Sequence, residues 1–180
     1  MNIAITGHTS GIGRALKEYF EAEGHQVLGF SRATGHNITA SVQRQAIADA
    51  AEHCDIFINN AYNDFDSSQL EMLKLICTRW TGLNKIVFNV GSRIGDYDVP
   101  STAVGLKLYQ HTKQAQDAYC AGRTHAPQVV NLRLGRIDTP RIQSVTDAKL
   151  STEKVVDIVK FVLEHRGEFC VSSISVGPQV

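Results

Sequence analysis

The chain has 180 residues, of which 43% are hydrophobic and 20% are charged, so it is long and apolar enough for a globular domain with a substantial core. Basic and acidic residues both number 18, and the formal net charge is zero. This balance disfavours nucleic acid and anionic membranes as partners, because both select a basic surface. We expect a single domain over residues 1–180.

Apolar residues recur with strand-like and helix-like periods in alternation along the chain. The expected strands are residues 2–6, 26–30, 36–39, 54–59, 85–90, 128–132 and 168–174. The expected helices are residues 12–23, 40–52, 67–80, 102–121 and 151–164. Strands that alternate with helices indicate βαβ units. The pattern therefore predicts an α/β fold of the Rossmann type, a doubly wound and mostly parallel sheet with helices on both faces, in three layers.

The spacing of the cysteines and histidines, and the length of the apolar runs, exclude several classes of site. Cys54, Cys77, Cys120 and Cys170 form no C-x-x-C pair, so we expect reduced core thiols and neither a zinc site nor a disulfide framework. The histidines lack metal-ligand spacing, and we expect no metal. No stretch approaches the ~20 apolar residues of a membrane helix. The N-terminus enters a strand without a basic leader, so the expected location is the cytoplasm.

A glycine-rich turn separates the first expected strand from the first expected helix. Its residues are Gly7, His8, Thr9, Ser10, Gly11, Ile12 and Gly13. Glycine lets the backbone approach a pyrophosphate without a Cβ clash, and the N–H groups at a helix N-terminus attract an anion. The turn therefore predicts dinucleotide binding, and the alternative is an ordinary strand–helix connection.

Five segments in order resemble the short-chain dehydrogenases/reductases, beginning with Thr-Gly-x-x-x-Gly-Ile-Gly at residues 6–13. The others are Asn59-Asn60-Ala61-Tyr62, Ser92 after a strand, Tyr109-x-x-x-Lys113, and residues 134–140. The resemblance implies a nicotinamide-dependent oxidoreductase. It assigns catalysis to Ser92, Tyr109 and Lys113, and it places Asn60, Ala61 and Thr139 beside the cofactor. The alternatives are a strand-end turn for Asn60 and Ala61 and a helix cap for Thr139.

Tyr109 and Lys113 are four residues apart on an expected helix, so both side chains point to one face. A nearby cation favours phenolate and so lowers the phenol pKa from about 10. Tyr109 could then exchange a proton with a substrate oxygen during hydride transfer. By the resemblance, Lys113 also holds the nicotinamide ribose, and Ser92 hydrogen-bonds the substrate carbonyl. A packing pair with a solvated lysine is the alternative.

The residues after the second expected strand favour one dinucleotide. An acidic residue that binds the ribose 2′-hydroxyl of NAD is expected about 20 residues beyond the glycines, where this chain has Ser31 and Arg32. Arg32 can instead pair with a 2′-phosphate, so we predict NADP(H) over NAD(H). His8 could add a donor, and by the resemblance Asn37 contacts the adenine. The alternative for Arg32 is a solvated loop residue.

Several positions depart from the family pattern. Tyr62 replaces a glycine, and no asparagine falls at the position of the family's fourth catalytic residue, to which residues 66–68 are nearest. The chain is also shorter than typical members, and residues 141–150 are too few for a large lid.

These observations leave two classes of function. The first is an NADP(H)-dependent reductase or dehydrogenase for a small-molecule carbonyl or alcohol, with Tyr109 as acid and base. The second is a dinucleotide-binding regulatory or scaffolding protein with little turnover. A nucleotide-sugar epimerase with the same tyrosine and lysine is a weaker third option. The resemblance also implies a homodimer.

Overall fold

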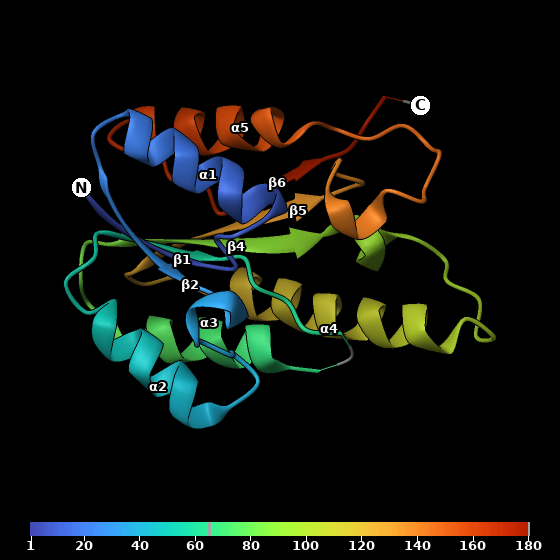
Figure 1. Cartoon of the computed structure of the whole chain (residues 1–180), viewed down its shortest axis with the longest axis horizontal. Helices are drawn as coiled ribbons and strands as arrows, with labels where there is room; N and C mark the ends of the chain where they lie inside the picture. The colour runs from blue at the N-terminus through green and yellow to red at the C-terminus, as the bar shows by residue number, and fades with distance from the viewer. Residues whose placement is uncertain (65, 180) are drawn as a thin grey trace.

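A computed structural model describes residues 1–64 and 66–179 as a six-stranded sheet enclosed by helices (Figure 1). Its strands are β1 (Asn2–Thr6), β2 (Gln26–Phe30), β3 (Ile56–Asn59), β4 (Ile86–Ser92), β5 (Gln128–Leu134) and β6 (Ser173–Val176). They are ordered β2-β1-β3-β4-β5-β6, and each neighbouring pair is parallel. The predicted Rossmann-type α/β class is confirmed, with a fully parallel sheet in the described residues.

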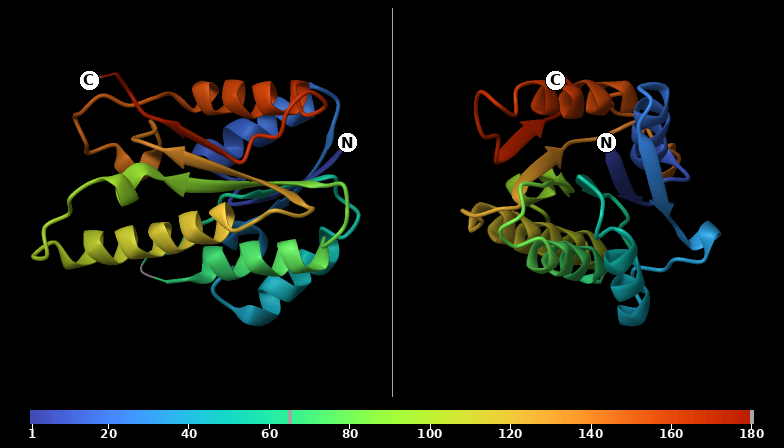
Figure 2. Two further views of the ribbon diagram at one scale, coloured as in Figure 1. Left: turned by 180° about the vertical axis from the view of Figure 1, so that it is seen from behind. Right: turned by 90° about the vertical axis from the view of Figure 1, so that its left-hand side faces the viewer.

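The helices form layers on both faces of the sheet (Figures 1 and 2). They are α1 (Gly11–Ala22), α2 (Ser41–Ala50), α3 (Ser68–Arg79), α4 (Val104–Ala121) and α5 (Thr152–Glu164). Helices α1 and α5 cover one face, and α2, α3 and α4 cover the other. Three short 3-10 turns lie in the connections, namely η1 (Arg32–Thr34), η2 (Arg93–Asp96) and η3 (Pro140–Ile142). None of the described helices is both long and apolar enough to cross a membrane.

Each face of the sheet buries its own apolar cluster, which explains the continuous hydrophobic runs of the central strands. On one face, Leu16 and Phe20 of α1 and Val159 of α5 pack over the strands. On the other face, Ile47 of α2 and Leu73 of α3 do so. Residues at period 3.6 bring one side of each helix to the sheet, so the helical spacing read from the sequence corresponds to real burial.

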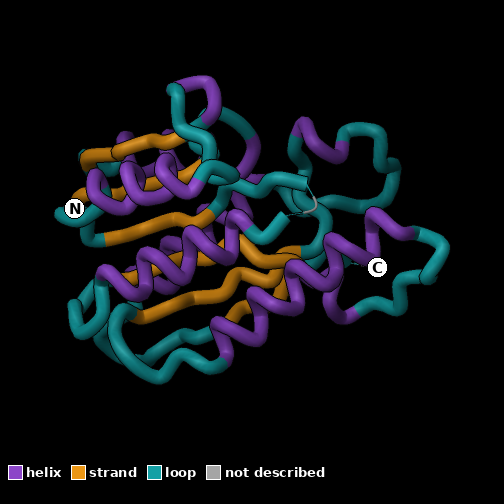
Figure 3. The backbone as a smooth tube through the Cα atoms, turned by 90° about the horizontal axis from the view of Figure 1, so that it is seen from below, coloured by secondary structure: helices purple, strands orange, loops and turns teal. Residues whose placement is uncertain are grey.

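The strand order creates a crevice at the carboxyl end of the sheet. The chain passes from β1 to β2 on one side and then returns past β1 to form β3 on the other. Connections therefore leave the carboxyl ends of β1 and β3 in opposite directions, and open α/β sheets bind ligands at such a switch point. Figure 3 shows the longest loops, with their short helical turns, beyond the end of the sheet opposite the N-terminus.

The strand expected at residues 36–39 is wrong, because this segment is a turn. Its backbone bonds are local: the N–H of Ala40 donates to the Asn37 carbonyl at 3.2 Å, and the N–H of Thr39 donates to Asn37 Oδ1 at 3.2 Å. Nη1 of Arg44 in α2 donates a hydrogen bond to the Ile38 carbonyl at 2.6 Å. An asparagine that bonds the backbone two residues on favours a turn over a sheet ladder.

The last strand begins later than the apolar pattern predicts, at Ser173 instead of residue 168. The N–H of Glu168 donates to the His165 carbonyl at 2.9 Å, so this stretch still belongs to the turn that ends α5. Cys170 is exposed there, which corrects the prediction of four core thiols; the other three cysteines are buried, and all four are free.

Phe88 of β4 is fully buried at the centre of the sheet, so its truncation tests the packing. We expect Phe88→Ala to lower the free energy of unfolding by about 3–5 kcal/mol, because a large cavity replaces the ring. Urea unfolding followed by circular dichroism measures the loss. Leu83→Ala is the control, since Leu83 is 43% exposed and should cost far less. Equal losses in the two variants would contradict the packing described.

Candidate active site

A cavity of about 1360 Å³ opens at the carboxyl end of the sheet, at the switch point. Ligand pockets for small molecules measure about 300–1,000 Å³, so this one has room for a dinucleotide and a small substrate. Most residues that the sequence predicts for the site line it, namely Gly7, Thr9, Ser10, Gly11, Ile12, Ser31, Arg32, Asn37, Asn60, Ala61, Ser92, Tyr109, Lys113 and Thr139. Residues from opposite ends of the sequence are thus brought to one surface.

The glycine-rich turn forms the floor of one end of the cavity. Gly7 and Gly11 have φ angles of +73° and +52°, a left-handed backbone that glycine adopts without strain. Helix α1 begins directly after the turn, and the side chain of its N-cap residue Ser10 makes no capping hydrogen bond. Thr139 Cγ2 would lie only 3.1 Å from a Cβ at position 11, so the segment after β5 closes over the turn. The arrangement suits a phosphate group.

The structure does not bring His8 or Gly13 to the cavity wall. A Cβ at position 13 would lie 2.2 Å from the carbonyl oxygen of Gly7, so Gly13 allows α1 to pack tightly beneath the turn. The His8 ring occupies the space next to Gly29 of β2, where a Cβ would lie 2.4 Å from it. Its Nδ1 is buried and has no hydrogen-bond partner among the described residues. Gly13 therefore shapes the turn from below, and His8 faces the neighbouring strand.

The carboxyl ends of β1 and β3 are joined by the hydroxyl of Thr6. This oxygen accepts hydrogen bonds from the N–H groups of Asn60 and Ala61, both at 3.0 Å, and donates to the Ile58 carbonyl at 3.3 Å. The Asn60 amide donates to the carbonyls of Thr6 and Gly7, at 3.0 and 3.2 Å. Asn60 thus supports the shape of the glycine-rich turn besides lining the cavity.

Polar and cationic groups surround the part of the cavity that follows β2. The backbone N–H of Ser31 donates to Thr34 Oγ1 at 3.0 Å, which fixes the start of η1 and holds Arg32 at the mouth. His36, which the sequence analysis did not select, also lines this end and packs edge-on against Phe30, with ring centroids 5.0 Å apart. No short motif marks His36, because the turn that places it was read as a strand.

Carboxylates are scarce around the cavity. Among the described residues, Asp147 is the only carboxylate on its wall, and it is paired with Arg136 at 2.9 Å. The region of Ser31 and Arg32 therefore carries no negative side chain on the cavity wall that would repel a phosphate.

The predicted catalytic side chains meet at the other end of the cavity. Ser92 ends β4, and its Oγ accepts from the N–H of Ile94 at 3.1 Å, while Tyr109 and Lys113 lie on α4. Burial raises the pKa of Tyr109 above its usual value, and a hydrogen bond with Ser92 opposes this in part. The expectation that Lys113 lowers the phenol pKa is therefore not what the geometry gives: desolvation dominates.

Lys113 is 3% exposed, and its charge is costly there. Burial, reinforced by the nearby Arg141 guanidinium, lowers the pKa of Lys113 to about 7, whereas Asp117 acts in the opposite sense. The ammonium donates to Gln69 Oε1 at 2.7 Å, to the Val90 carbonyl at 3.2 Å and, less closely, to Gln116 Oε1 at 3.4 Å. The sequence analysis missed both glutamines: Gln69 lies on the separate helix α3, and Gln116 lies three residues beyond Lys113 on α4 but belongs to no motif.

Tyr62, which stands where the family pattern has glycine, covers the lysine. Its ring centroid lies 4.7 Å from Lys113 Nζ, 5.2 Å from the Tyr109 ring centroid and 5.0 Å from Arg141 Cζ. Arg141 in turn forms an ion pair with Asp64. Tyr62 therefore adds an aromatic wall between the pair Tyr109 and Lys113 and the segment that follows β5.

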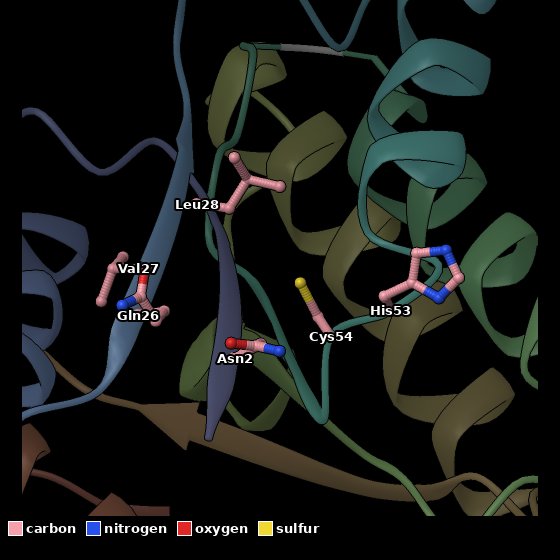
Figure 4. A pocket seen from close by; sticks show the side chains of 6 residues that line it. All are labelled: Asn2, Gln26, Val27, Leu28, His53 and Cys54. Carbon is pink, nitrogen blue, oxygen red and sulfur yellow. The ribbon is translucent and has the colours of Figure 1, made fainter.

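A second hollow, of about 230 Å³, lies at the opposite end of the sheet (Figure 4). It is lined by Asn2, Gln26, Val27, Leu28, His53 and Cys54, at or near the amino ends of β1, β2 and β3. It contains none of the predicted site residues. In residues 1–64 and 66–179, no group of three or more histidine, cysteine or acidic side chains is placed to hold a metal ion.

The buried lysine makes stability depend on pH in a definite direction. Its folded-state pKa of about 7 is below the unfolded value of 10.5, so between these values the unfolded chain binds more protons. The free energy of unfolding should therefore rise from pH 7 to pH 9, relative to Lys113→Met, by at most about 1.4 kcal/mol per pH unit. Urea titrations of both proteins measure it, and a constant difference over this range would contradict a depressed pKa.

Comparison with known proteins gives no sequence match: no protein-family model and no curated protein matches the chain. Solved structures do match. Serine dehydrogenase from Escherichia coli has a TM-score of 0.78 at 17% identity, over 99% of this chain and 98% of that one. The 3-alpha-hydroxysteroid dehydrogenase from Pseudomonas sp. B-0831, solved with NADH, has a TM-score of 0.74 at 20% identity, over 97% and 94%.

A short chain dehydrogenase from Burkholderia cenocepacia J2315, solved with NADP, has a TM-score of 0.74 at 19% identity, over 98% of this chain and 87% of that one. Identities this low show the fold alone. The resemblance read from the motifs is nevertheless confirmed at that level, and the chain has the fold of the short-chain dehydrogenases/reductases.

Proposed function

We propose that the protein is an NADP(H)-dependent oxidoreductase that interconverts a carbonyl and an alcohol in a small molecule. The observation that carries the proposal is the meeting of Ser92, Tyr109 and Lys113 in the cavity whose other end is built by the glycine-rich turn. Structural neighbours solved with NADH and with NADP support a nicotinamide cofactor. A proton donor and a dinucleotide site in one cavity are what hydride transfer to a carbonyl needs.

The cavity suits a dinucleotide in two places. Gly7 and Gly11 leave no side chain between the turn and a pyrophosphate, and the uncapped start of α1 offers N–H donors. Ser31, Arg32 and His36 would surround a 2′-phosphate, which favours NADP(H) over NAD(H). When bound, the nicotinamide ring supplies or accepts the hydride.

Side chains of the protein would donate and accept the proton that accompanies hydride transfer. Because burial raises its pKa, Tyr109 holds its proton at neutral pH and can donate it to the oxygen of a carbonyl that is being reduced. Ser92 lines the same cavity, its hydroxyl interacts with Tyr109 in the sense that lowers the phenol pKa, and it could donate to the same substrate oxygen. Such donors are most effective where negative charge develops on that oxygen. The return reaction transfers the proton back to Tyr109.

A second candidate is a dinucleotide-binding regulatory or scaffolding protein with little turnover. One observation favours it: the Tyr62 ring lies over the Lys113 ammonium, on which the family resemblance relies to hold the nicotinamide ribose. In both candidates the dinucleotide binds, so turnover separates them. The homodimer and the cytoplasmic location expected from the sequence stay predictions.

Replacing Arg32 tests the choice of cofactor. We expect Arg32→Ala to weaken NADPH binding by about tenfold or more while NADH binding changes little, because a charge-assisted hydrogen bond to the 2′-phosphate is lost. Fluorescence titration of both cofactors measures this. Arg166→Ala is the matched control, since Arg166 contacts Asn84 and does not line the cavity. Equal losses for NADPH and NADH would mean that Arg32 does not read the 2′-phosphate.

Replacing Tyr109 tests the chemistry. Tyr109→Phe should reduce NADPH-dependent turnover of a panel of aldehydes and ketones by about 10²–10⁴-fold, because the proton donor is gone, while NADPH affinity persists. Tyr19→Phe is the control, because Tyr19 lies on α1 and does not line the cavity. Undiminished turnover in Tyr109→Phe would refute the assigned role. NADPH binding without turnover in the unmodified protein would favour the regulatory candidate.

A further inference from the structure

The ammonium of Lys113 is held from the side of α3 by a single amide. Gln69 Oε1 lies 2.7 Å from Nζ and is the shortest of its three hydrogen bonds. Gln69 is fully buried on α3. It belongs to none of the five sequence segments that resemble the short-chain dehydrogenases/reductases. The contact joins α3 to α4 across 44 residues of sequence, in the layer beneath the cavity.

The orientation of the Gln69 amide is fixed by its other bonds. Its Nε2 donates to the Asn59 carbonyl at 2.8 Å and to the Val90 carbonyl at 3.1 Å. Both of its N–H groups are therefore committed, and the opposite end of the amide must present the oxygen to Lys113. Gln116 supports this arrangement, because its Nε2 donates to Gln69 Oε1 at 3.0 Å.

Among the described residues, no carboxylate is paired with Lys113 Nζ as a close counter-ion. The hydrogen-bonded acceptors are two amide oxygens and one backbone carbonyl. Arg141 opposes the positive charge from η3, and Asp117 favours it from the next turn of α4. The rings of Tyr62 and Tyr109 lie 4.7 and 5.7 Å from Nζ, measured to their centroids. Neutral acceptors therefore provide the direct stabilisation of the ammonium in a buried site.

We propose that Gln69 is a positioning residue that fixes the Lys113 ammonium beside Tyr109 and, through its locked amide oxygen, sets how readily that ammonium forms. An inverted amide would turn N–H groups toward the ammonium and repel it. The link from Lys113 to catalysis rests on the proposed function, whereas the effect of Gln69 on the charge of Lys113 does not.

The test follows the titration of Lys113 in protein without cofactor, by NMR of ¹³C- and ¹⁵N-labelled lysine, with the signal assigned by its loss in Lys113→Met. Gln69→Met removes the oxygen that stabilises the charged form, so the Lys113 pKa should fall below about 7. Gln69→Glu replaces it with a carboxylate, so the pKa should rise by about one unit or more. Gln116→Met, which removes the 3.4 Å contact, should lower it less.

The control is Gln128→Met. The Gln128 amide donates to the Val171 carbonyl at 3.1 Å at the start of β5, away from the cavity, so its loss should leave the Lys113 titration unchanged. A role for Gln69 in packing alone predicts lower stability in both of its variants with no shift in Lys113. An unshifted pKa in folded Gln69→Met and Gln69→Glu would overturn the proposal. If Gln69→Met fails to fold, Gln69→Glu and Gln116→Met still decide, by the directions of their shifts.

Turnover is measured separately from the NMR titration of Lys113. In the Gln69→Met protein, kcat for NADPH oxidation should fall roughly 10–100-fold, as expected for loss of a hydrogen bond to a charged group, with a smaller change in KM. The pH dependence of kcat should move in opposite directions in Gln69→Met and Gln69→Glu, following the Lys113 pKa. Shifts in the NMR titration without turnover in any protein would refute the proposed function and leave the positioning role standing.

Discussion

The geometry of the site depends on the junction between the carboxyl ends of β1 and β3. One buried hydroxyl, that of Thr6, accepts two backbone N–H groups there, and the Asn60 amide returns two bonds to the β1 side. Parallel strands alone would leave these ends unpaired, since their ladder stops at the last residue. The junction instead fixes the glycine-rich turn relative to the next strand, and the remaining walls of the cavity are assembled around it.

Local patterns in the sequence were sufficient for the parts of the site that lie within one element or one connection. The glycine spacing defines a turn whose backbone demands are local, and Tyr109 and Lys113 share a face because they are four residues apart on one helix. The alternation of elements also predicts the class of fold. These features are robust because few long-range contacts are needed to specify them.

Other features depend on contacts between distant segments and could not be read in this way. Gln69 meets Lys113 only because α3 and α4 pack side by side beneath β4, which no spacing in the sequence encodes. Residues 36–39 resemble a short strand only through Ile38 and Thr39, which favour strands, and the local hydrogen bond that Asn37 accepts makes the segment a turn. The pKa of Tyr109 was expected to fall, but the expectation counted the neighbouring charge and not the burial that outweighs it.

Tyr62 has a consequence for how the mouth of the cavity is held together. Its ring contacts two cations, Lys113 inside and Arg141 outside, and Arg141 is bonded to Asp64 on the loop that carries Tyr62. The loop after β3 therefore contacts α4 on the inner side, through Lys113, and the segment after β5 on the outer side, through Arg141. The contact between Tyr62 and Lys113 is buried and little affected by dissolved ions, whereas the ion pair of Arg141 and Asp64 is exposed and screened by salt. Added salt therefore weakens the ion pair of Arg141 and Asp64 at the rim, while the buried contact between Tyr62 and Lys113 is left unchanged.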